Sequence, residues 1–159
     1  MVEVQLVTQK KDVAFAKVQK YITRGPGTIE PPCPSFGPPF FCGGCDWLNL
    51  SYETQLKYKT ELVREQIQSL HPGIDIPNTI ASPVIQHYRN KAFMPVSKGK
   101  NGLEFGIYER WSHKIVPHKT CFLHPSEFDL IAHRCLELMD NAKVQPYDET
   151  SHTGTLRHI

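Results

Sequence analysis

Three of the five cysteines in this 159-residue sequence lie close together. Cys33, Cys42 and Cys45 fall within the stretch CPSFGPPFFCGGC, among prolines, glycines and aromatic residues. Clustered thiols are used in disulfides, in redox catalysis or in metal binding. The odd cysteine count and the charged N-terminus, which has no signal-peptide core, argue against a disulfide framework.

The Cys42-Gly-Gly-Cys45 pair is a C-x-x-C motif, and it allows more than one chemistry. A thioredoxin-like redox pair sits where a strand meets a helix, whereas this pair follows a proline-rich loop, so redox catalysis is disfavoured. Zinc sites usually combine two such pairs, and only one is present. Histidines do lie near the distant Cys121, however: His113, His118 and His124.

An iron–sulfur cluster needs four thiolates, often three close together and one distant. Cys121 can supply the distant thiolate beside Cys33, Cys42 and Cys45. The spacing therefore indicates a metal site and leaves zinc and iron–sulfur open. The fifth cysteine, Cys135, lies on the apolar side of a predicted helix and is interpreted as a small core residue.

The elements around these cysteines mix strands and helices. Alternating polarity predicts strands at 2–8 and 13–22, further strands at 84–96, 103–110 and 114–117, and a hairpin turn at Asn101-Gly102. Helices are predicted at 51–70, capped by Ser51, and at 126–143, capped by Ser126 with Asp129. These elements predict an α+β fold: an antiparallel sheet, two main helices and a loop-rich cysteine lobe.

Each predicted helix has an apolar face at helical spacing. The first face comprises Tyr52, Leu56, Val63, Ile67 and Leu70, and the second comprises Phe128, Ile131, Cys135, Leu138 and Ala142. We expect both faces to pack inward.

Positive charge is concentrated in the middle of the chain. The net charge is only +2, but residues 76–120 carry seven Lys and Arg against two Glu. Arg89 and Lys91 would share one face of the strand predicted there, where they could contact RNA phosphates or simply be solvated. No segment is long and apolar enough to span a membrane, and we expect a cytoplasmic monomer.

Several motifs resemble one known family. CGGCDWLNLSYETQLKYKTELVREQI, SPVIQHYRNKAFMPV, GIYERWSHKIVPHKTCFL and HTGTLRHI are similar, in this order, to blocks of bacterial RNA 5-methyluridine methyltransferases. Those enzymes use S-adenosylmethionine to methylate a uracil C5 in ribosomal or transfer RNA. Several carry a [4Fe–4S] cluster, and the resemblance implies Cys33, Cys42, Cys45 and Cys121 as its ligands.

The resemblance also implies a domain order. Residues 1–30 would be the tail of an RNA-binding TRAM-like β-barrel, 31–150 a central iron–sulfur and RNA-binding domain, and 151–159 the start of a methyltransferase region. The sequence has no glycine-rich cofactor loop after a strand. We therefore expect a fragment that supplies the cluster and RNA recognition through Arg89 and Lys91, but cannot methylate alone.

Two other functions remain open from the sequence. One is a stand-alone RNA-binding module stabilised by zinc or by a cluster. The other is a small electron-transfer protein, which the positive middle segment disfavours because such carriers are usually acidic.

Overall fold

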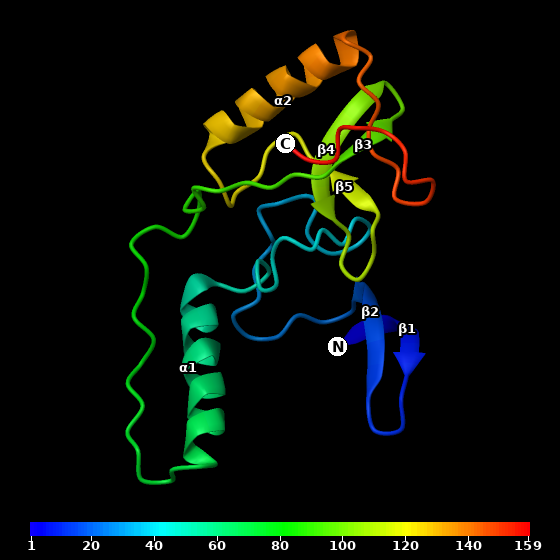
Figure 1. The fold of residues 1–159 in the computed structure, drawn as a ribbon. Coiled ribbons are helices and arrows are strands. Elements are labelled where there is room, and N and C mark those ends of the chain that lie inside the picture. The colour runs from blue at the N-terminus through cyan, green and yellow to red at the C-terminus, as the bar shows by residue number, and fades with distance from the viewer. The chain divides into compact units, whose positions relative to one another are not determined.

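A computed structural model describes residues 1–159, which divide into two compact units. Unit 1 comprises 1–32 and 47–85, and unit 2 comprises 33–46 and 86–159. The elements, in chain order, are β1 (Val2–Gln9), β2 (Ala14–Tyr21), α1 (Tyr52–Gln68), β3 (Val96–Gly99), β4 (Gly102–Tyr108), β5 (Ile115–Pro117) and α2 (Ser126–Asn141) (Figure 1). The predicted α+β class is confirmed, and no helix is both long enough and apolar enough to cross a bilayer.

Unit 1 begins with the predicted pair of strands. β1 and β2 form an antiparallel hairpin whose register shifts at two places, between Glu3 and Val4 and between Leu6 and Thr8. Every residue of β1 is exposed, because no further strand or helix covers either face. The structure therefore contains a two-stranded hairpin, and no closed barrel.

Helix α1 begins where the sequence predicts. The Ser51 side chain accepts a hydrogen bond from the Thr54 N–H and caps the first turn. An extended segment then returns beside the helix (Figure 1), held by a Thr60–Thr79 hydroxyl contact of 2.8 Å and by Arg64 donating to the Ile76 carbonyl. The predicted inner face is wrong in part, because Val63 and Leu70 are exposed and Thr60 is the one buried residue of the helix.

Unit 2 is built on the three-stranded antiparallel sheet β3-β4-β5. Helix α2 packs against β4 (Figure 1). The core of unit 2 comprises Met94, Val96, Phe105, Ala132 and Leu136. The β3–β4 hairpin turns at Lys100-Asn101, and Gly102 has a φ of +130°, which suits glycine. Both the hairpin and the short strand β5 agree with the sequence prediction.

The interior side of α2 differs from the predicted one. Asp129, Ala132 and Leu136 are buried, whereas Ile131 and Leu138 are more than half exposed. The predicted cap is also wrong, since no side chain caps the helix and Pro125 occupies the N-cap position. The inward face is therefore one position away from the face that apolar residue types alone predicted.

The strand predicted at 84–96 forms only at its last residue. His87 and Arg89 donate backbone hydrogen bonds to the carbonyls of Phe122 and Leu123, and Met94 exchanges a pair of bonds with Ile159. The segment thus pairs with two different partners and makes no continuous ladder. Without that strand, the argument that placed Arg89 and Lys91 on a common face no longer holds.

Candidate metal centre

The loop that carries Cys33, Cys42 and Cys45 is fixed to the end of β4. The Gly43 N–H donates to the Tyr108 carbonyl at 2.9 Å, and the Arg110 N–H donates to the Phe41 carbonyl at 3.0 Å. Within the loop, the Cys42 N–H donates to the Ser35 carbonyl. These backbone bonds replace the regular ladder that a proline-rich loop cannot form.

Both glycines of the C-x-x-C motif lie close against neighbouring atoms, and Gly43 leaves no room for a side chain. A Cβ on Gly43 would lie 2.8 Å from the Tyr108 carbonyl oxygen, which is a backbone atom and cannot swing aside. A Cβ on Gly44 would lie 3.0 Å from Ile107 Cδ1 and 3.7 Å from Cys42 Sγ. The two glycines therefore let the thiol loop lie directly against β4.

Cys121 lies in the loop between β5 and α2. Its N–H donates to Asp129 Oδ2 at 3.0 Å, which ties the loop to the first turn of α2. Backbone bonds from His87 and Arg89 hold the next residues of the loop. Residues 87–89 and α2 therefore position Cys121 from two directions.

Three of the four candidate thiols, Cys42, Cys45 and Cys121, have raised pKa values to which neighbouring thiols contribute. The pKa of Cys45 is raised to about 11, chiefly by burial and to a smaller degree by the nearby Cys121, Cys42 and Cys33. Burial is also the main cause of the raised pKa values of Cys42 and Cys121, and in both cases Cys33 adds to the shift. The loop thiols and Cys121 are thus gathered in one region of unit 2.

Several groups in the same region favour the thiolate form. Backbone hydrogen bonds from Gly44 to Cys42 and from Leu123 to Cys121 lower the pKa of each thiol. Arg110 lowers the pKa of Cys42, and Arg89 lowers that of Cys45, in each case as a smaller contribution than burial. Arg110 is itself held by Asp46 at 2.6 Å and by the Cys45 carbonyl. Amide and guanidinium donors of this kind stabilise sulfur ligands of a metal site.

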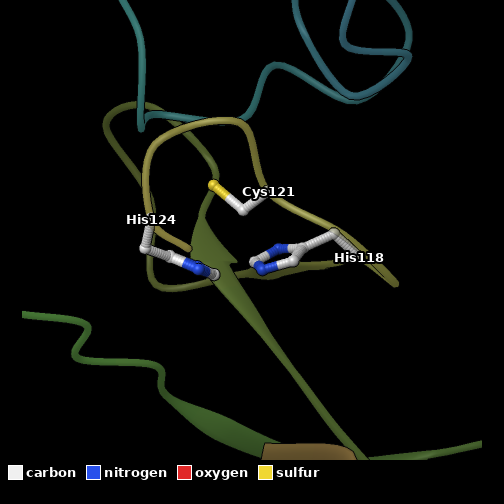
Figure 2. A group of neighbouring side chains, drawn as sticks. All are labelled: His118, Cys121 and His124. Atoms are coloured by element: carbon white, nitrogen blue, oxygen red, sulfur yellow. The ribbon is translucent and has the colours of Figure 1, made fainter. Parts of the chain in front are cut away.

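A second group of metal-ligating side chains surrounds Cys121. One ligand atom from each of His118, Cys121 and His124 lies within 4.8 Å of the other two, and Figure 2 shows the three side chains converging. Burial lowers the pKa of His118, which keeps its ring neutral near pH 7. The sequence places both histidines near Cys121, but only the structure brings their rings to its sulfur.

The remaining predicted residues lie apart from these thiols or on the surface. Arg89 and Lys91 are both exposed, and Arg89 is near enough to Cys45 to act on its pKa. Cys135 is half-buried on α2 and belongs to neither group of ligands. The assignment of the four cysteines as cluster ligands, and of Arg89 and Lys91 as RNA contacts, stays a prediction.

Comparison with known proteins relates these geometries to a function. No family model matches the sequence. The chain is 34% identical over 157 residues to an uncharacterized RNA methyltransferase of Halalkalibacterium halodurans, a match that covers 98% of this chain and 34% of that protein. The chain resembles part of an RNA methyltransferase.

Two further relatives agree with this similarity. An uncharacterized RNA methyltransferase of Gloeobacter violaceus is 35% identical over 161 residues, which cover 99% of this chain and 35% of that protein. An uncharacterized RNA methyltransferase of Listeria monocytogenes is 30% identical over 159 residues, which cover 99% of this chain and 34% of that protein. The chain thus spans about one third of the length of these RNA methyltransferases.

Proposed function

We propose that this chain is the iron–sulfur and RNA-recognition part of an RNA uracil-C5 methyltransferase. The proposal is carried by one observation: in unit 2 the pKa values of Cys42, Cys45 and Cys121 are each raised in part by other members of the four-cysteine set, within a chain similar to RNA methyltransferases over nearly its whole length. Three parts of the proposal are inferred from the motif resemblance: the methylated atom, uracil C5; the methyl donor, S-adenosylmethionine; and the type of cluster.

The donor set fits a [4Fe–4S] cluster. Cys33, Cys42, Cys45 and Cys121 offer four thiolates, and amide N–H groups of the same loops donate to two of them. The loop of Cys33, Cys42 and Cys45 is fixed by backbone bonds at the end of β4, and the Cys121 loop is held by Asp129 of α2, so the thiols are positioned by the fold. A bound cluster would tie the two loops together through four Fe–S bonds.

The chain has no evident means of transferring a methyl group by itself. Methylation of C5 in the related family requires a cysteine nucleophile and a general base beside the methyl donor. Four of the five cysteines are proposed as ligands, and Cys135 lies half-buried on α2. We therefore propose that the remaining two thirds of the relatives' length supplies catalysis.

An RNA-binding measurement tests the recognition part of this proposal. If Arg89 and Lys91 contact phosphates, changing both to Ala should weaken binding to single-stranded RNA and reduce the slope of log affinity against log salt by about 0.7 per lost contact. A matched control changes two exposed lysines of α1, Lys57 and Lys59, to Ala and should leave the slope unchanged. An unchanged affinity in the first variant would remove these residues from RNA recognition.

A further inference from the structure

The loop between β5 and α2 contains donors that the four-cysteine site does not use. His118, Cys121 and His124 follow one another at intervals of three residues, and their ligand atoms lie within 4.8 Å of one another (Figure 2). Both imidazoles are surplus to a cluster that is bound by thiolates alone. Their convergence on Cys121 requires a separate explanation.

The His118 ring is oriented as a metal ligand. One of its nitrogens hydrogen bonds with the Val116 backbone, while Nε2 is buried and has no partner. The nitrogen that is left for the Val116 contact is Nδ1, and a proton on Nδ1 keeps the lone pair of the neutral ring on Nε2. Metal-bound histidines are typically fixed in this way, with one nitrogen donating to a carbonyl and the other free to bind.

A buried carboxylate beside the same group also has an unpartnered oxygen. Asp129 Oδ2 accepts from the Cys121 N–H, whereas Oδ1 has no hydrogen-bond partner. His124 Nε2 lies 3.7 Å from Oδ1, which is beyond hydrogen-bond distance. Buried polar atoms are almost always paired, so two unpartnered atoms in one cluster suit a bound cation.

Aromatic neighbours hold both rings in place. The Phe105 ring meets His118 edge to face at 5.3 Å between centroids, and Phe128 stacks on His124 at 5.7 Å. His124 is 4% exposed, and its Nδ1 lies 3.3 Å from the Pro125 carbonyl. The rings are therefore positioned before any ion arrives.

We propose that His118, Cys121 and His124 bind a single divalent ion of the Zn²⁺ type, with Asp129 balancing its charge. Two imidazoles and one thiolate form a donor set that suits zinc, and they leave one tetrahedral position for a fourth ligand. Cys121 also belongs to the proposed cluster ligands, so the single ion and the four-thiolate cluster compete for it. This site does not depend on the cluster proposal.

The test separates the two sites by removing the other thiols. A Cys33→Ser/Cys42→Ser/Cys45→Ser variant retains all three proposed ligands and is titrated, metal-free and reduced, with Co²⁺ as a spectroscopic substitute for Zn²⁺. We expect one ion per chain, tetrahedral ligand-field absorption and charge transfer from one thiolate. If circular dichroism shows this variant unfolded, Cys33→Ser/Cys45→Ser is titrated instead.

Histidine variants identify the ligands. His118→Gln or His124→Gln, added to the same background, should weaken Co²⁺ binding by at least the ~10–100-fold typical of a lost outer-shell partner. His113→Gln, whose side chain is 85% exposed, is the matched control and should bind normally. Failure of the folded thiol variant to bind Co²⁺, or binding that both histidine variants leave unchanged, would overturn the proposal. Neither result depends on whether the wild-type chain assembles an iron–sulfur cluster.

Discussion

The metal-free protein should have an unusually unreactive thiol at Cys45. Its pKa of about 11, raised from 9.0 chiefly by burial, lowers the thiolate fraction near pH 8 by about a hundredfold. A thiolate of higher pKa is also a better nucleophile. With a Brønsted coefficient of about 0.4–0.5, this raises the rate constant of the thiolate nearly tenfold and offsets part of the loss. Exchange with a small disulfide reagent should therefore be about tenfold slower than in the unfolded chain.

The assay is quenched thiol–disulfide exchange, with Cys45 followed by mass spectrometry from pH 7 to 10. The folded rate should keep rising by about tenfold per pH unit through this range, whereas the rate in denaturant should level off near pH 9. Cys121→Ser removes the neighbour that raises the pKa most after burial, so it should speed the reaction. A folded rate that levels off below pH 9 would refute the electrostatic reasoning.

The same pKa shift sets a direction for stability. Because the pKa of Cys45 is higher in the folded state than the ordinary value of 9.0, its contribution to the metal-free fold is fully present below pH 9. It is lost as the pH rises toward 11, so denaturant midpoints should fall over that interval.

Two further substitutions test how the fold supports the site. Gly43→Ala places a Cβ 2.8 Å from a backbone carbonyl oxygen, so it should impair metal uptake by the loop of Cys33, Cys42 and Cys45. The control Gly73→Ala meets nothing within 4 Å and should leave uptake unchanged. Equal uptake by both variants would show that the loop does not need to lie against β4. Leu136→Ala should lower the free energy of unfolding by about 3 kcal/mol in a denaturant titration, because Leu136 is 6% exposed in the core of unit 2. Leu130→Ala, at a position 72% exposed on the same helix, should cost much less, and equal losses would contradict the observed inner face of α2.

Local signals in the sequence were sufficient for much of the fold. Ser51 caps α1 as predicted, and Asn101-Gly102 marks the β3–β4 hairpin. Each of these features depends on residues a few positions apart, which is why propensity and turn chemistry detect them.

Features that depend on distant partners could not be predicted in this way. Residues 84–95 have the apolar pattern of a strand, but their backbone bonds go to the Cys121 loop and to Ile159, which no local pattern reveals. The observed inner face of α2 lies one position away from the predicted one because Asp129 points inward and accepts a hydrogen bond from the Cys121 N–H. Residue type alone assigns a carboxylate to solvent or to a helix cap.

The candidate site shows the same division. The spacing of Cys33, Cys42, Cys45 and Cys121 predicts a metal site, and the resemblance implies that these four residues are the ligands of a [4Fe–4S] cluster. The sequence did not reveal the unpartnered Nε2 of His118, because burial of that atom depends on packing against residues distant in sequence, such as Phe105.

Elemental and Mössbauer analysis of anaerobically prepared protein tests whether the four cysteines hold a [4Fe–4S] cluster. The proposal predicts about four irons and four sulfides per chain, the Mössbauer signature of a cubane, and loss of all three when Cys121 is changed to Ser. Stoichiometric zinc without sulfide in protein prepared with both metals available, or a cluster that survives the Cys121→Ser change, would contradict it.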